Sequence, residues 1–364
     1  MTASKIEWTD RSDWNAIRGC TRVSPGCGGP GSHGGCYAEA IAARFSDPGQ
    51  AFHGFAERTS KGGRWTGKVA IVPERVALPL TWRKPSTIFA SSTSDFFHEA
   101  LAQDEIADLF GVMAVAATKF QGANDGYDVR GHYDASDGRK VPLRWPRLRS
   151  GPHTFQVLTK RPDRMASLLN SPHFRKMVAQ AAYRHAHDRV DAGDRHDRIM
   201  DGAMWPLPNV WAGTSVENQE WADKRQAHFE ATPAAVKFVS YEPALGPVDW
   251  TGWEFVDQII GGGESGPSAR PAHPDWFRET RDFCAENKIA YFHKQNGEFA
   301  PGEIAGDYLN PDKRAKGMSL FDGRWDECWS EVEGHCDDEP DVYRVGKKRA
   351  GRLLDGVTHD GFPG

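Results

Sequence analysis

The sequence predicts an α/β fold in which parallel strands alternate with helices as a full or partial (β/α) barrel. Two observations predict it. Strand-like and helix-like segments alternate about seven times along the chain, and parallel neighbours need crossover helices. Polar residues follow each predicted strand, so they could converge on one mouth of a barrel. A doubly wound sheet would explain the alternation but not the shared position of these polar residues.

Hydrophobic periodicity places each element in turn. Strands are expected at residues 5–9, 68–72, 87–91, 154–158, 209–213, 236–240, 256–260 and 289–293. Helices are expected at residues 37–45, 104–117, 162–169, 218–232 and 275–288. The helix at 104–117 has Ile106, Leu109 and Met113 on one face, and Pro162 suits the first turn of a helix.

The alternating pattern predicts one barrel domain over residues 1–298, followed by a C-terminal extension or small cap over residues 299–364. Two segments interrupt the pattern. Residues 119–152 are polar, contain turn signals and are expected to form a loop, and residues 171–206 are rich in His and Arg and favour a helical excursion. Both are interpreted as insertions at the surface of the barrel.

Composition favours a cytoplasmic protein in a reducing compartment. The chain has 364 residues, 39% hydrophobic residues and a formal net charge of −5, so no overall basic field points to nucleic acid. The N-terminus has no apolar signal core, and no stretch approaches the roughly 18 apolar residues of a membrane span. Six cysteines in this length are too few for a disulfide scaffold.

Three of the six cysteines, Cys20, Cys27 and Cys36, fall within 17 residues and are separated mainly by small, flexible residues. Soft thiolate ligands suit iron–sulfur clusters and zinc. A 4Fe-4S cluster with three cysteines leaves one iron open to a small molecule, whereas structural zinc wants a fourth ligand, for which His33 is well placed. Unrelated buried thiols are the weaker interpretation, because apolar periodicity is absent here.

Two other features have simpler explanations. Cys328, His335 and Cys336 lie within nine residues and could form a second metal site, although incidental thiols in the tail explain them as well. Cys284 is expected in the core of a helix. The glycine run at 261–263 could hold a phosphate, but it lacks a complete nucleotide-binding motif.

Several motifs together resemble one known family. They are KIEWT at 5–9, WN at 14–15, GC at 19–20, GC at 26–27, CYAE at 36–39, SDFFH at 94–98, FQVLTKRP at 155–162, SYEP at 240–243 and GGESG at 262–266. Over most of residues 5–297 the chain resembles a family of phage- and prophage-encoded, largely uncharacterised proteins related to the radical S-adenosylmethionine enzymes and distantly similar to spore photoproduct lyases. That family usually places its last two cysteines two residues apart, whereas eight residues separate Cys27 from Cys36 here. The insert could bulge outward or recruit His33.

The resemblance implies a radical-S-adenosylmethionine-like barrel in which Cys20, Cys27 and Cys36 bind three irons of a 4Fe-4S cluster and S-adenosylmethionine chelates the fourth. One electron would then split the sulfonium and give a 5′-deoxyadenosyl radical that takes a hydrogen atom from substrate. An electron donor such as flavodoxin or ferredoxin is implied as a partner. Related enzymes hold the cofactor with polar groups at strand ends, which here are Ser94, Asp95, Thr159, Lys160, Ser215, Glu217, Glu242 and Glu264.

Alternatives remain at this point. Lys160 and Glu242 could form an internal ion pair instead of contacting a cofactor. The rival function is a zinc-stabilised, non-catalytic binding module in which Cys20, Cys27, His33 and Cys36 close a tetrahedral site. That module does not explain why polar residues recur after strand upon strand. The phage context, the 13 tryptophans and the local arginine clusters suggest a nucleic acid base or nucleotide as substrate.

Overall fold

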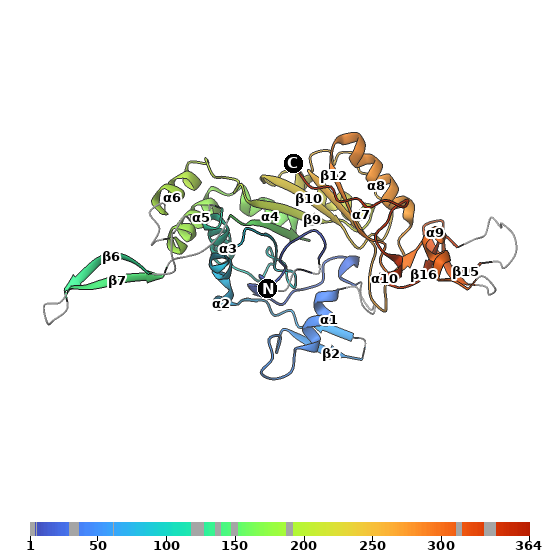
Figure 1. The fold of residues 1–364 in the computed structure, drawn as a ribbon, viewed down its shortest axis with the longest axis horizontal. Coiled ribbons are helices and arrows are strands. Elements are labelled where there is room, and N and C mark those ends of the chain that lie inside the picture. The colour runs from blue at the N-terminus through green and yellow to red at the C-terminus, as the bar shows by residue number, and fades with distance from the viewer. Residues whose placement is uncertain are drawn as a thin grey trace.

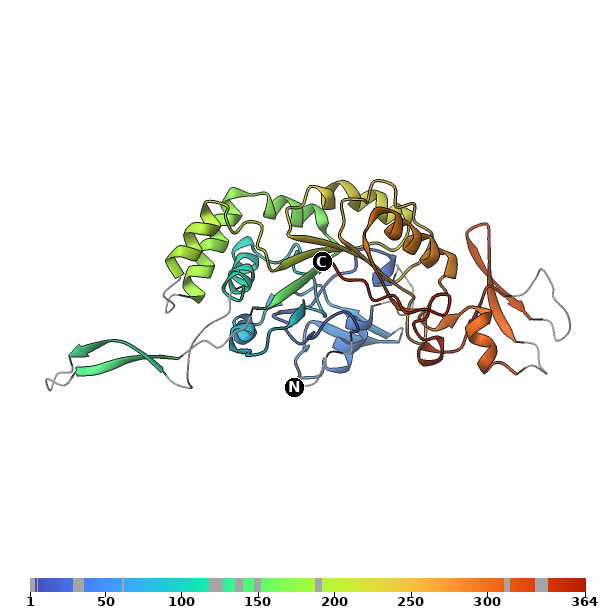
Figure 2. The ribbon, with the colours of Figure 1, turned by 45° about the horizontal axis from the view of Figure 1, so that its top comes forward.

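A six-stranded parallel sheet forms the centre of the molecule, with strand order β12-β11-β10-β9-β8-β5. The computed structural model describes residues 4, 6–28, 36–60, 62–117, 152–186, 192–310, 315–330 and 340–364, and the backbone of 127–134 and 140–146. The six strands are β5 (Thr87–Ala90), β8 (Thr154–Thr159), β9 (Val210–Ser215), β10 (Val236–Tyr241), β11 (Gln258–Gly262) and β12 (Ala290–Gln295). Each strand pairs with the next one along the chain, and the sheet curls into a half-barrel (Figures 1 and 2). The expected α/β fold is confirmed, with a parallel sheet that forms a half-barrel compatible with a partial (β/α) barrel.

Helices lie along the outer face of the half-barrel (Figure 2). They are α3 (Gln103–Val115), α4 (Pro162–Leu169), α5 (Pro172–His185), α6 (Ala192–Met200), α7 (Gln219–Glu230) and α8 (Pro274–Asn287). As the expected helices imply, β10 and β11 are joined by a segment without a helix. Trp250 and Trp253 of this segment are buried in the main core and cover the sheet there instead.

Three local expectations need correction. Residues 6–9 form turns rather than a strand, and Trp8 packs onto the concave face of the sheet. The segment at 68–72 contributes only β4 (Ala70–Ile71), which pairs antiparallel with β1 (Ile17–Arg18) outside the main sheet. Within 119–152 the described backbone forms a hairpin of β6 (Tyr127–Asp134) and β7 (Lys140–Pro146) rather than a loop.

The two faces of the sheet bury different cores, because successive residues of a strand point to opposite faces. Val239 of β10 belongs to the main core under the helices, whereas Phe238 belongs to a small cluster on the concave face. Trp8 closes this cluster, with its ring centroid 4.7 Å from Phe89 and 5.8 Å from Phe238. A Cβ atom at Gly213 would lie 2.3 Å from the Phe238 ring, so only glycine allows this packing. The concave face therefore has an apolar floor.

The C-terminal extension forms its own antiparallel sheet with strand order β13-β16-β14-β15. Its elements are β13 (Phe299–Ala300), α9 (Gly302–Ala305), β14 (Lys316–Phe321), β15 (Arg324–Trp329), β16 (Val342–Arg344) and α10 (Lys347–Ala350). The chain then returns to the half-barrel, where the Gly361 amide donates to the Tyr291 carbonyl at 2.9 Å and Gln258 Nε2 donates to the Gly361 carbonyl at 2.7 Å. The last residues thus line the β12 edge of the sheet.

Among the described residues, no helix combines the length and the apolar character that a membrane-spanning helix requires.

His293 of β12 should make folding stability depend on pH. The ring is fully buried, with Nε2 2.9 Å from Asn296 Oδ1 and Nδ1 3.1 Å from the Tyr291 hydroxyl. Burial lowers the pKa of His293 to about 4. Because the unfolded chain takes up the proton first, as the pH falls from about 6.5 to 4, stability should decrease by up to about 3 kcal/mol.

Urea denaturation of wild type and of His293→Gln across this pH range tests the prediction. The variant should show a smaller slope of unfolding free energy against pH, whatever its absolute stability. His53→Gln, at an exposed histidine, is the control and should keep the wild-type slope. An unchanged slope in His293→Gln would show that another group controls the pH dependence.

Candidate functional site

A cavity of about 420 Å³ opens at the carboxyl ends of the parallel strands. Its volume falls in the range of about 300–1,000 Å³ that is typical of ligand sites, and this edge of a parallel sheet is where such sites form. Trp8, Phe89 and Leu158 line its apolar part. Its remaining walls come from strand ends, from the segment that carries Cys20, Cys27 and Cys36 (the cysteine loop) and from the C-terminal extension. The half-barrel therefore positions one large polar site above an apolar floor.

Strand periodicity explains why polar side chains stand above this floor. In β10, Phe238 belongs to the concave cluster, and Ser240 and Glu242, two and four residues further on, line the cavity. In β8, Leu158 packs against the same cluster, and Lys160 follows two residues later in the cavity wall. Each strand thus ends with polar residues on its concave side.

The structure brings together most of the residues that the sequence singled out. The cavity is lined by Ser94, Asp95, Thr159, Lys160, Ser215, Glu242 and Glu264, and by Cys20, Cys27 and Cys36. Glu217 is not part of the lining and lies behind it, where its carboxylate accepts a hydrogen bond from Lys160 Nζ. The Ser94 hydroxyl already has a partner within the protein, because it donates to the Ile17 carbonyl at 3.2 Å.

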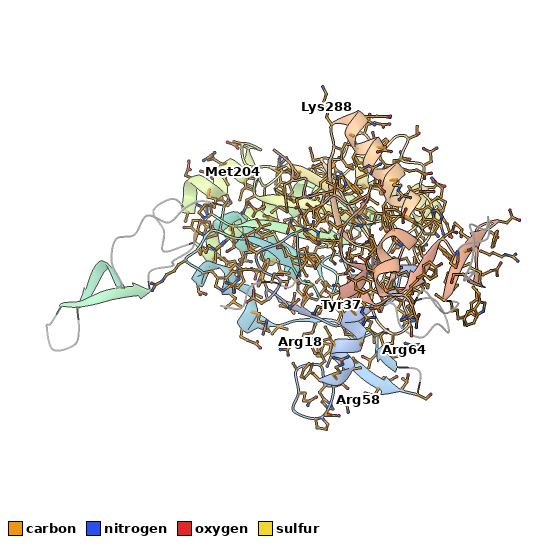
Figure 3. All side chains as sticks on the ribbon, turned by 45° about the vertical axis from the view of Figure 1, so that its right-hand side comes forward. Arg18, Tyr37, Arg58, Arg64, Met204 and Lys288 are labelled. Atoms are coloured by element: carbon orange, nitrogen blue, oxygen red, sulfur yellow. The ribbon has the colours of Figure 1, made fainter. Side chains whose placement is uncertain are left out.

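The described ends of the cysteine loop are held by one buried carboxylate. Glu39 lies on α1 (Tyr37–Arg44) and accepts from Arg22 at 2.5 Å and from the Trp65 amide at 2.9 Å. Arg22 also donates to the Gly28 carbonyl at 2.8 Å. Glu39 thereby ties the loop to α1 and to β3 (Gly62–Trp65), which pairs with β2 (Ala56–Thr59). Figure 3 shows Tyr37 where α1 meets the half-barrel, and Arg58 of β2 farther out.

The three thiols are close enough to influence one another electrostatically. Burial raises the pKa of Cys20, and burial followed by the charge of Cys27 raises the pKa of Cys36 to about 11. In the described parts of the chain, no three His, Cys, Asp or Glu side chains form a group that could hold a metal ion. His33, His335 and Cys336 lie outside the described residues.

A second network fixes the loop next to Cys20. Asp95 accepts hydrogen bonds from the Thr159 hydroxyl at 2.6 Å and from Arg161 at 3.0 Å. Arg161 is itself buried and donates through Nη2 to the Thr21 hydroxyl at 2.7 Å. Thr21 adjoins Cys20, so the end of β8 is linked directly to the first cysteine of the loop.

Glu217 forms a third network on the other side of the loop. Its fully buried carboxylate accepts from Arg225 at 2.8 Å, from the Ser24 hydroxyl at 2.5 Å and from Lys160. Burial opposes the charge, but Lys160 and Arg225 hold the pKa of Glu217 down to about 2. A Cβ atom at Gly26 would lie 2.6 Å from Glu217 Oε1, so the loop needs glycine at this point of contact.

The ion pairs differ from the one that the sequence suggested. Lys160 does not pair with Glu242. Glu242 pairs instead with Lys294, whose Nζ lies 2.7 and 2.8 Å from its two carboxylate oxygens. Glu264 pairs with Arg270, which also donates to the Pro25 carbonyl at 3.0 Å.

Sequence reasoning missed four cations of these networks, Arg22, Arg225, Arg270 and Lys294. Lys294 could have been found, because it follows the apolar Phe292 by two residues in the same strand. Arg225 and Arg270 carry no local signal.

Three buried polar atoms in residues of the cavity wall lack a hydrogen-bond partner. They are Trp8 Nε1, Ser91 Oγ and Gln295 Oε1. Buried polar groups are nearly always paired with protein, water or ligand, because an unmade hydrogen bond costs roughly 1–3 kcal/mol. These three atoms are themselves closed off from solvent, so they lie behind the surface of the wall rather than facing an occupant of the cavity.

Comparison with known proteins gives one family match. A family model described as "Protein of unknown function (DUF5131)" matches residues 3–121 and 148–363. The matched segments include the cysteine loop, the strands of the half-barrel and the C-terminal extension, and they omit the hairpin of β6 and β7. No curated protein and no solved structure matches the chain.

Proposed function

The chain belongs to this family of proteins of unknown function, and we propose that it is an iron–sulfur enzyme that reductively cleaves S-adenosylmethionine to start radical chemistry on a further substrate. The main support is that Cys20, Cys27 and Cys36 line one cavity at the carboxyl edge of a parallel half-barrel. A binding module would not need polar strand ends around the same space.

The chemistry of the donor set suits a 4Fe-4S cluster, because thiolates are its usual ligands and three cysteines around one cavity could each bind a different iron and leave the fourth iron for a small molecule. The three thiols do not form a preassembled metal-binding group among the described residues, so binding of the cluster would have to bring them together. When bound, the cluster would supply the electron that cleaves S-adenosylmethionine.

The chain's own residues would hold and enclose the reactants. The apolar floor around Trp8 and Phe89 limits access of water to the cavity from the side of the sheet. Asp95 and Glu217 are occupied by cations of the protein, so their proposed role is to fix the cysteine loop.

Anaerobic reconstitution tests the proposal. We expect about four irons and four sulfides per chain, a reduced EPR spectrum that changes when S-adenosylmethionine is added, and production of 5′-deoxyadenosine. Cys27→Ala should lose the iron and the product. Cys284→Ala is the matched control, because Cys284 is buried in α8 among core residues, and it should retain both. Stoichiometric zinc without iron would instead support a zinc-stabilised binding module.

The substrate and the reducing partner are separate parts of the proposal. A nucleic acid base or nucleotide is the proposed substrate class, and a flavodoxin or ferredoxin is the proposed electron donor. If DNA, RNA and nucleotides all leave the rate of S-adenosylmethionine cleavage unchanged, the proposed substrate class is wrong.

A further inference from the structure

We propose that Lys347, in the C-terminal extension, binds an oxyanion of the substrate, either a phosphate or a carboxylate. The inference rests on the proposed function in one respect, namely that the cavity is the active site. Lys347 is exposed and belongs to the cavity wall, although it lies more than 180 residues after Lys160 in the sequence.

Charge pairing within the cavity wall distinguishes Lys347 from the other cations. Lys160, Arg161 and Lys294 form ion pairs with Glu217, Asp95 and Glu242, respectively. In the described part of the chain, Lys347 is the cation of the wall that has no acidic partner. An ammonium group without a partner can bind phosphate or carboxylate as a point charge.

The backbone around Lys347 is held in place by residues that follow β12. The Gly346 amide donates to the Glu298 carbonyl at 3.0 Å, on one side of Lys347. On the other side, Asn296 donates through its side-chain Nδ2 to the Ala350 carbonyl at 2.8 Å and through its backbone N–H to the Gly351 carbonyl at 3.0 Å. Figures 1 and 2 show α10 between the half-barrel and the antiparallel sheet. Lys347 is therefore carried by an anchored segment.

The position of the other unpaired charge defines the orientation of the ligand. Glu7 also belongs to the cavity wall and has no ion-pair partner among the described residues. It lies in the N-terminal segment beside Trp8, whereas Lys347 is anchored next to β12. A ligand would place its negative group toward α10 and a neutral or positive part toward the N-terminal segment.

Calorimetric titration of the full-length protein tests the proposal with three probes: AMP, adenosine and adenosine-5′-carboxylic acid. We expect AMP to bind wild type at least about tenfold more tightly than adenosine. Lys347→Gln should abolish this preference, and Lys348→Gln, at the adjacent exposed lysine outside the cavity wall, should retain it. Tight binding of AMP alone identifies a phosphate site, and tight binding of both anionic probes identifies a general oxyanion site.

Three results would overturn the proposal: equal binding of AMP and adenosine, no binding of either anionic probe at millimolar concentration, or equal loss of the preference in Lys347→Gln and Lys348→Gln. The titration does not require a cluster, so a preference for AMP in iron-free protein would separate this inference from the proposed function. Conversely, iron incorporation and S-adenosylmethionine cleavage without any preference for AMP would refute only the role of Lys347.

Discussion

Replacing Glu217 by alanine should destabilise the folded protein by about 3–5 kcal/mol. Glu217 is fully buried, and its partner Arg225 has a side chain only 2% exposed. Removal of the carboxylate would leave the guanidinium in the interior without a compensating charge. The Ser24 hydroxyl would lose its acceptor at the same time, which would release one side of the cysteine loop. Urea denaturation at neutral pH measures the loss.

Two variants make this prediction specific. Glu220→Ala removes a carboxylate three residues further along, in the first turn of α7, but Glu220 and its partner Lys224 are both exposed, so the change should cost less than about 1 kcal/mol. Glu217→Gln retains most of the volume and removes only the charge. If it is as destabilising as Glu217→Ala, charge rather than packing is the cause. Equal effects of Glu217→Ala and Glu220→Ala would contradict the buried ion pair.

The second large effect is expected for Arg161→Met, which should cost about 3 kcal/mol or more and weaken retention of the iron in the proposed cluster. Arg161 and Asp95 are both almost fully buried, so methionine would leave Asp95 without its cation. The change also removes the donor to Thr21, the residue next to Cys20. We expect reconstituted Arg161→Met to lose iron to a chelator several times faster than wild type. The decrease in absorbance near 400 nm measures this loss.

Arg164→Met is the matched control for this experiment. Arg164 is three residues further along and donates to backbone carbonyls, including that of Leu101 at 2.5 Å, with no ion pair among the described residues. Its loss should cost about 1 kcal/mol and leave iron retention close to wild type. If Arg161→Met is destabilised but retains iron normally, Arg161 has a structural role without positioning Cys20.

Much of the fold could be predicted from the sequence because strand and helix periodicity is local. The helix at 162–169 matches α4 at both ends, since Pro162 marks its first turn. The sequence predicts no helix between β10 and β11 and none forms, but what covers the sheet there could not be predicted in this way. Trp250 and Trp253 cover the sheet there through contacts that depend on the three-dimensional arrangement. The sequence predicts a strand at 5–9 because apolar Ile6 and Trp8 alternate with polar residues, but packing of a turn on the concave face produces the same pattern.

Sequence spacing was enough to predict that polar residues follow the strands and that Cys20, Cys27 and Cys36 belong to one short glycine-rich segment. Those features depend on short-range spacing, which the chain carries into any structure. The three-dimensional arrangement pairs Lys160 with Glu217, 57 residues away, and Lys294 with Glu242, 52 residues away. It also decided that Lys347 of the C-terminal extension reaches the cavity. Such pairings depend on the curvature of the sheet and on the path of the returning chain, which local spacing does not define.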